Sequence, residues 1–187
     1  MERLETRLDG PILLKPKVFG DERGFFTETY RRTAYAEHGI PEEMVQDNHS
    51  RSSARIVRGM HFQIGDGAAK LVRCGRGSIY DVIVDLRKGS PTFGHWEGFD
   101  LTEENFHMLY CPIGFAHGFC VTSDVADVFY KQSNYYADET ERGISYRDPD
   151  VGITWPIPVD ELIPSERDTH APTLAEIADD LPFTYSA

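Results

Sequence analysis

The sequence predicts an all-β protein, and two observations carry that prediction. Apolar runs of strand length follow one another closely, and glycine and proline separate them at short intervals. Helical signals are few, and a chain with many short strands and few helices is typical of a β-sandwich or β-barrel. We expect strands at residues 44–52, 56–63, 69–75, 78–86, 95–100, 106–111, 118–122 and 125–132.

The clearest of these strands is 78–86. Its even-numbered positions from Tyr80 to Leu86 fall on one face, because side chains alternate across a strand. Asp81 and Asp85 fall on the other face together with two isoleucines. Both faces therefore carry large apolar side chains.

Turns and two short helices complete the expected elements. Residues 88–91 and 147–150 have the glycine, proline and aspartate content of turns. A helix is expected at 33–38, with Gly39 as its C-terminal stop. A second helix is expected at 173–180, where a threonine is followed three residues later by glutamate, the pattern of a capping box.

Length and charge limit the class of protein. The 187 residues suit a single domain, 1–187, with a sizeable core, and 40% apolar residues suit a folded chain. The sequence lacks an apolar stretch of membrane-spanning length and begins without a signal-peptide core, so we expect a cytoplasmic protein. The formal net charge of −12 argues against nucleic acid and anionic membranes as partners. Any phosphate site must therefore be a local basic pocket.

The cysteines indicate neither a disulfide framework nor structural zinc. Cys74, Cys111 and Cys120 are odd in number and contain no C-x-x-C pair. We expect reduced thiols in the core.

His61 is the residue that points most directly to chemistry. It lies in a predicted buried strand, three residues after Arg58. Imidazole titrates near neutral pH and can take or give a proton, while a guanidinium suits two-point contact with a phosphate. Strict alternation would place the two side chains on opposite faces. A β-bulge at Gly59 would re-aim one of them and bring them together; without such a bulge, one of the two residues is misassigned.

An ordered series of motifs resembles the dTDP-4-dehydrorhamnose 3,5-epimerase family, over about residues 11–171. The motifs are GDERGFF at 20–26, QDNHS at 46–50, RGMHFQ at 58–63, KLVR at 70–73, DLR at 85–87, SPTFG at 90–94, GFAHGF at 114–119, YK at 130–131 with YY at 135–136, and DPDVGITWP at 148–156. The resemblance implies a double-sheet jelly roll of the cupin type with a few short helices. It also implies a homodimer.

The resemblance implies an isomerase that needs no cofactor and inverts C3 and C5 of dTDP-4-keto-6-deoxyglucose. In that reading His61 is the base, Asp168 orients it, Tyr130 is the acid, and Lys70 lies near the ketone or a phosphate. The implied substrate-binding residues are Arg23, Glu28, Gln46, Asp47, Asn48, Arg58, His117, Tyr136, Glu141 and Arg167. Tyr136 would stack on thymine, and the arginines would hold the diphosphate. Many relatives carry lysine where this chain has Arg167.

Three alternatives remain open from the sequence. One is a single-carbon epimerase of a dTDP-4-keto-deoxysugar in secondary metabolism, which would keep the same catalytic residues. Another is a nucleotide-sugar binding protein without catalysis. The third is a metal-dependent cupin, but the seven histidines form no compact ligand group in the sequence, so we expect no metal.

Overall fold

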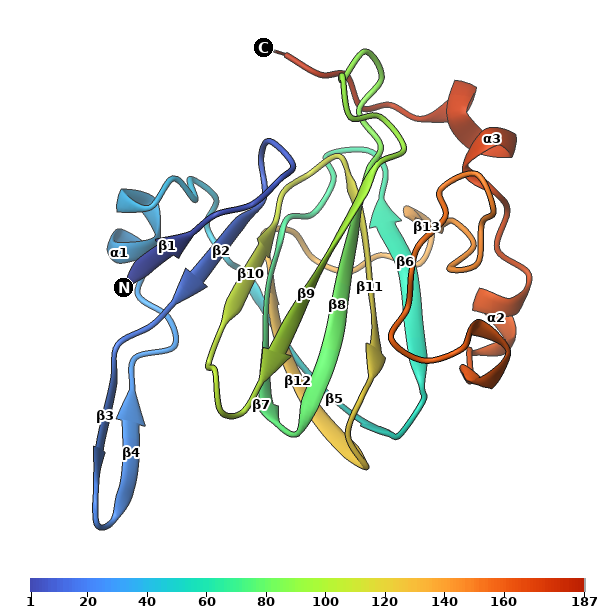
Figure 1. Cartoon of the computed structure of the whole chain (residues 1–187). Helices are drawn as coiled ribbons and strands as arrows, with labels where there is room; N and C mark the ends of the chain where they lie inside the picture. Colours follow the sequence, from blue (N-terminus) through green and yellow to red (C-terminus); the bar gives the residue numbers. More distant parts are fainter. Residues whose placement is uncertain (187) are drawn as a thin grey trace.

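The computed structural model describes residues 1–186, and its strands form two antiparallel sheets that face each other (Figure 1). The six-stranded sheet has the order β1-β2-β10-β7-β12-β5, and the five-stranded sheet has the order β13-β6-β11-β8-β9. A separate hairpin is formed by β3 and β4. This arrangement confirms the predicted all-β double-sheet jelly roll with a few short helices.

The elements agree closely with the predicted strands. The strands are β1 (Glu2–Leu4), β2 (Ile12–Lys15), β3 (Val18–Asp21), β4 (Gly24–Thr27), β5 (Gln46–Ser53), β6 (Val57–Gln63), β7 (Lys70–Arg76), β8 (Ser78–Asp85), β9 (Trp96–Thr102), β10 (Met108–Cys111), β11 (Phe115–Val121), β12 (Val125–Gln132) and β13 (Glu141–Gly143). The helices are α1 (Arg32–Glu37), α2 (Glu166–Thr169) and α3 (Leu174–Ile177), with 3-10 turns η1 (Val159–Glu161) and η2 (Ala178–Asp180). Each predicted strand overlaps one of β5 to β12.

The elements missed from sequence are short. β1 to β4 and β13 have three or four residues each, too few to show alternation, and α2 is a single turn. The expected helix 173–180 is divided into α3 and η2, and its capping box between Thr173 and Glu176 is present.

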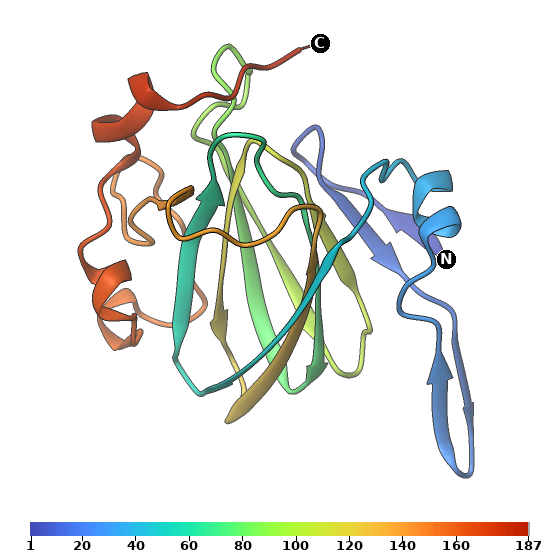
Figure 2. The same ribbon diagram turned by 180° about the vertical axis from the view of Figure 1, so that it is seen from behind.

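β8 is buried on both faces, which explains its two apolar faces. Ile79 and Ile83 pack in the core between the sheets. Val82 and Val84 pack instead under the C-terminal segment, in a second core that includes Trp155. Figures 1 and 2 show this segment, with α2 and α3, running beside β6. The chain after β13 therefore acts as a third layer that covers the outer face of the smaller sheet.

A β-bulge lies at the position expected from the sequence. Between the pairs His61–His117 and Arg58–Phe119, β6 advances three residues while β11 advances two. Gly59 occupies the bulge with φ of +129°, and an added Cβ there would lie 2.5 Å from Cα of Gly118. Only glycine fits this combination of backbone angle and close approach.

The β3–β4 hairpin projects away from both sheets (Figures 1 and 2). Its strands pair only with each other. Phe19, Phe25 and Phe26 on this hairpin are 53%, 64% and 69% exposed. Large apolar side chains gathered on a projecting element mark a contact surface. No helix within residues 1–186 is long and apolar enough to cross a membrane.

Candidate active site

A cavity of about 460 Å³ opens between the two sheets. Strands β6 and β11 of the smaller sheet line it together with β5, β7 and β12 of the larger one, and the chain around α2 closes one side. The predicted residues that line it are His61, Tyr130, Asp168, Lys70, Arg58, His117, Tyr136, Glu141 and Arg167. All four residues that we expected to be catalytic therefore lie around one space.

His61 and Asp168 form a hydrogen-bonded pair in the wall of this cavity. The distance from His61 Nε2 to Asp168 Oδ1 is 2.6 Å, and Asp168 is 4% exposed. Ser165 caps α2 by accepting a hydrogen bond from the Asp168 N–H, which fixes the carboxylate at the start of the helix. The Gly59 N–H approaches the other carboxylate oxygen at 3.4 Å.

The surroundings of Asp168 keep it ionised. Burial raises its pKa, but the hydrogen bond and charge of His61, together with hydrogen bonds from Gly59 and Ser165, outweigh burial, so the net pKa is lowered. An anionic partner on one ring nitrogen orients the imidazole and stabilises the imidazolium that forms when the other nitrogen takes a proton. The pair therefore has the arrangement of an oriented general base.

Tyr130 reaches the cavity from the opposite sheet. It lies on β12, whereas His61 lies on β6. Burial raises the pKa of the phenol, and the nearby Glu141 raises it further. The phenol is thus kept protonated at neutral pH, as a proton donor requires.

Lys70 lies close to His61. Its Nζ donates a hydrogen bond to the backbone carbonyl of His61, at 3.4 Å. Burial lowers its pKa, and the neighbouring Cys111, Glu141 and Asp81 oppose that shift in part. A cation in such a site can face negative charge that develops on a bound molecule.

A second histidine–aspartate pair lies in the same region. His117 is directly opposite His61 in the β6–β11 pairing, and its Nε2 is 3.0 Å from Oδ2 of Asp81. Both residues are buried, and Oδ1 of Asp81 has no hydrogen-bond partner within residues 1–186. Sequence reasoning placed His117 in the site and missed Asp81, although an aspartate in an apolar strand was a usable signal.

Cationic and aromatic groups are also found in the cavity lining. Arg58 is exposed and donates to the Ser52 hydroxyl at 2.9 Å. Arg167 is paired with Glu141, which also accepts a hydrogen bond from the Tyr136 hydroxyl at 2.9 Å. Two guanidinium groups beside a half-exposed aromatic ring create a local site for an aromatic anion in a chain of net charge −12.

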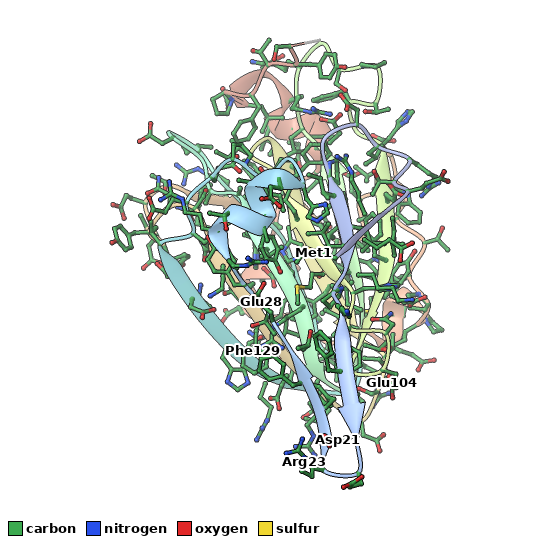
Figure 3. All side chains as sticks on the ribbon, turned by 90° about the vertical axis from the view of Figure 1, so that its left-hand side faces the viewer. Met1, Asp21, Arg23, Glu28, Glu104 and Phe129 are labelled. Carbon is green, nitrogen blue, oxygen red and sulfur yellow. The ribbon has the colours of Figure 1, made fainter. Side chains whose placement is uncertain are left out.

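Five predicted binding residues do not line this cavity. Arg23 lies at the tip of the β3–β4 hairpin and pairs with Asp21 (Figure 3). Glu28 follows the hairpin and pairs with Arg31. Asp47 pairs with Lys131 at 2.9 Å beside a separate small depression.

The remaining two, Gln46 and Asn48, hydrogen-bond to each other at 3.0 Å on β5. Gln63 and Gln132 line the cavity and were not predicted as site residues. Their position two residues from a predicted catalytic residue on the same strand was the signal available in the sequence.

Histidine and acidic side chains do not gather here as metal ligands do. Within residues 1–186, no group of three or more histidine, cysteine, aspartate or glutamate side chains is arranged to hold a metal ion. Absence of a metal requirement stays a prediction.

Comparison with known proteins places the chain in a family. The family model of dTDP-4-dehydrorhamnose 3,5-epimerase matches residues 5–176. An enzyme of that name from Pseudomonas aeruginosa is 48% identical over 174 residues, which cover 91% of this chain and 96% of the relative. A dTDP-4-dehydrorhamnose 3-epimerase from Streptomyces niveus is 41% identical over 92% of this chain and 83% of its own length.

A solved structure gives the same result. The dTDP-6-deoxy-D-glucose-3,5-epimerase from Legionella pneumophila, in complex with dTDP-4-keto-L-rhamnose, has a TM-score of 0.95 to this chain. It is 42% identical, and the superposition covers 100% of this chain and 99% of that one. The similarity in sequence and the similarity in fold to these proteins thus both extend over nearly the whole chain. The chain belongs to the dTDP-4-dehydrorhamnose 3,5-epimerase family and is an enzyme of the isomerase class.

Proposed function

We propose that the protein inverts C3 and C5 of dTDP-4-keto-6-deoxyglucose without a cofactor and releases dTDP-4-keto-L-rhamnose. One observation carries the mechanism. The His61–Asp168 pair and the Tyr130 phenol line the same cavity from two different sheets. Inversion at carbon needs this arrangement, because the proton must leave one face of the sugar ring and return to the other.

The proposed steps follow from the acidity of carbons beside a ketone. His61 removes the proton from C3, the C–H electron pair moves into the ring, and negative charge develops on the C4 oxygen. Lys70 would face that oxygen, and a fixed cation at a developing oxyanion contributes on the order of several kcal/mol when water is excluded. Tyr130 then donates its proton to C3 from the opposite face as the carbonyl re-forms. His61 then loses its extra proton to water and the Tyr130 phenolate regains one from water, and the same steps at C5 complete the conversion.

The nucleotide would be held at the mouth of the cavity. Arg58 and Arg167 would contact the diphosphate through paired hydrogen bonds. Tyr136, 45% exposed, would stack on the thymine ring. These contacts would supply binding energy remote from C3 and C5, which orients the reacting carbons between base and acid.

Solvent-deuterium incorporation tests the proposal directly. The protein is incubated with the dTDP-4-keto-6-deoxy sugar in deuterated water, and the product is analysed by mass spectrometry and NMR. We expect deuterium at both C3 and C5 of the inverted sugar. Absence of deuterium at both carbons, with dTDP still bound, would instead identify a binding protein without catalysis.

A single-carbon epimerase is the second candidate. The relative from Streptomyces niveus, named as a 3-epimerase, favours it, because that enzyme is 41% identical to this chain. The same labelled product distinguishes the two. Deuterium confined to one carbon after prolonged incubation would identify the single-carbon reaction.

We also propose that the protein is a homodimer in which each hairpin completes the site of the other copy. Arg23 and Glu28 carry charges suited to the ligand but lie outside the cavity of their own chain. The exposed Phe25 and Phe26 on the same hairpin would be covered by a second copy.

Complementation between two inactive variants tests this arrangement. The Arg23→Ala and His61→Asn proteins are mixed in equal amounts, unfolded and refolded together. If Arg23 acts in the partner's site, each mixed dimer contains one intact site, and about a quarter of wild-type activity returns. If Arg23 acts in its own chain, no mixed dimer gains an intact site and activity stays low. Light scattering gives the oligomeric state of each sample.

A cytoplasmic location is proposed from the thiols. Cys74, Cys111 and Cys120 are all free and buried. Unpaired cysteines are typical of reducing compartments. Fractionation of cells that produce the protein would test this.

A further inference from the structure

Four side-chain amides form one continuous hydrogen-bonded chain beside the cavity. In order, they belong to Gln46, Asn48, Gln132 and Gln63. The three successive donor–acceptor distances are 3.0, 3.0 and 3.1 Å. Both ends reach the loop after β12. The Tyr136 N–H donates to the first amide at 2.9 Å, and the last amide donates to the Tyr135 carbonyl at 3.3 Å.

The backbone groups at the two ends fix the direction of the chain. The Tyr136 N–H can only donate, so Gln46 must accept with its oxygen and present its NH₂ to Asn48. Each following amide is oriented in turn by the one before it. At the far end this leaves an NH₂ group facing a backbone carbonyl, which can only accept. In this one orientation every donor of the chain faces an acceptor. In the opposite orientation, an NH₂ group would face the Tyr136 N–H and an amide oxygen would face the Tyr135 carbonyl.

One link of this chain joins the two sheets. Gln63 Oε1 accepts from Gln132 Nε2, and these residues lie on β6 and β12 respectively. They are 6% and 3% exposed. Side chains two residues apart on a strand share a face, so Gln63 lies beside His61 and Gln132 lies beside Tyr130. The link thus joins the two walls of the cavity next to His61 and Tyr130, the proposed base and acid.

The ends of the chain hold the loop that carries Tyr136. Gln63 Nε2 also donates to the Thr140 hydroxyl at 3.2 Å, so this loop is contacted at three points. Tyr136 itself is 45% exposed, and its hydroxyl also donates to the Glu141 carboxylate at 2.9 Å. The amide chain therefore connects the aromatic ring at the cavity mouth with the strands of the base and the acid.

We propose that Gln63 and Gln132 are positioning residues of the epimerase site. Their hydrogen bond sets the gap between the strands of His61 and Tyr130, and the chain they belong to orders residues 133–140 so that Tyr136 is ready to bind the nucleobase. The rate consequence rests on the proposed function, while the ordering of the loop does not depend on it.

Two substitutions at one position separate the parts of the proposal. Gln132→Met keeps the length of the side chain but removes both hydrogen bonds, so the link between sheets and the order of the loop are both lost. Gln132→Glu keeps an acceptor for Asn48 but cannot donate to Gln63. The Gln63 amide must then turn over so that its NH₂ donates to the new carboxylate. After this turn, the Gln63 amide oxygen faces the Tyr135 carbonyl and no hydrogen bond forms there. The link between sheets survives and the donation from Gln63 to the Tyr135 carbonyl is lost, while the Tyr136 N–H still donates to Gln46.

The matched control is Asn105→Ala. Asn105 makes three backbone hydrogen bonds in the turn between β9 and β10, to Thr102, His107 and Asp100, and does not line the cavity. This variant reports what loss of stability alone does to activity.

The experiment measures single-turnover deuterium incorporation, dTDP affinity by calorimetry, and amide exchange of residues 133–140. For Gln132→Met we expect incorporation to slow roughly 10- to 100-fold, since a displacement of about 1 Å can cost 100-fold. Its dTDP affinity should fall about three- to tenfold, and its loop amides should exchange faster. Gln132→Glu should show the faster loop exchange as well, and Asn105→Ala should show none of these changes.

Two results would overturn the proposal. One is loop exchange in Gln132→Met that equals that of the wild type. The other is a rate for Gln132→Met, per folded molecule, that equals that of Asn105→Ala. Wild-type protein that incorporates no deuterium would reject the proposed function, and the loop exchange would still decide whether the amide chain orders residues 133–140.

Discussion

His61 and Asp168 lie 107 positions apart in the sequence, and their side chains meet at 2.6 Å. The histidine comes from the middle of β6, and the aspartate comes from the single turn of α2, in the segment that covers the smaller sheet. The histidine and the aspartate are therefore in contact only when that segment is docked on the smaller sheet. The proposed catalytic pair therefore requires the C-terminal layer to be in place.

Replacement of His61, the proposed base, should slow turnover strongly and leave binding intact. In His61→Asn the amide cannot take a proton at neutral pH, so we expect kcat to fall by about 10²- to 10⁴-fold. Affinity for dTDP should change little, because the proposed nucleotide contacts involve other side chains. His95→Asn, at an exposed position, is the control and should keep full activity. Steady-state kinetics and calorimetry measure both, and a His61→Asn enzyme with near-normal kcat would exclude histidine as the base.

Asp168 should contribute to stability in a manner that depends on pH. Its pKa in the folded protein is lowered below the value of about 3.9 for an unfolded chain, so its contribution is fully present above that pH and is lost as the pH falls through the folded value. Asp168→Asn should lower the free energy of unfolding by about 1–3 kcal/mol at pH 7. The difference from wild type should shrink on acidification below about pH 4. Urea unfolding at several pH values tests this, and a difference that stays constant with pH would contradict it.

Lys70 should set the alkaline limit of kcat/KM. Burial lowers the pKa of Lys70 and raises the pKa of the Tyr130 phenol, so both shifts favour loss of the lysine proton as the pH increases. Activity should therefore decline below about pH 10.4, the ordinary value for lysine. In Lys70→Arg the cation persists at high pH, and the decline should move upward even though the maximal rate falls. Any ionisation of the substrate affects wild type and Lys70→Arg equally. An alkaline decline at the same pH in both proteins would show that a group other than Lys70 controls the decline.

The bulge in β6 should tolerate no side chain at Gly59. In Gly59→Ala the new Cβ would meet the backbone of Gly118 at 2.5 Å, in addition to the cost of a positive φ. We expect a loss of about 2–4 kcal/mol in the free energy of unfolding. Gly89→Ala also has a positive φ, +82°, but meets nothing within 4 Å, so it should lose only about 1 kcal/mol. Equal losses in the two variants would show that the close approach is unimportant.

The local sequence pattern was sufficient to predict most strands of the two sheets. β8 and β12 each have eight residues and are rich in β-branched and aromatic side chains. Their bounds were predicted within a residue or two. The hairpin strands β3 and β4 escaped prediction because they pair only with each other and expose phenylalanine, so no buried face produced a pattern. The extent of the domain, 1–187, stays a prediction.

The site could be predicted only in part for a related reason. His61 was recognisable from its own surroundings, but Asp168 looks like a surface charge until the C-terminal layer places it. Asp81 and Gln132 gain their partners from other strands, His117 and Gln63, and strand pairing is not written in local sequence. The resemblance to a family supplied most of the residue roles, and those roles stay predictions.

Deuterium incorporation by Tyr130→Phe tests the central claim most directly, because that claim assigns the two faces of the sugar to two different residues. Without the phenol, His61 can still remove a proton and return a deuteron to the same face. The account predicts deuterium at the reacting carbons of recovered substrate without inversion, while His61→Asn incorporates none. Inversion by Tyr130→Phe at the wild-type rate would contradict the account.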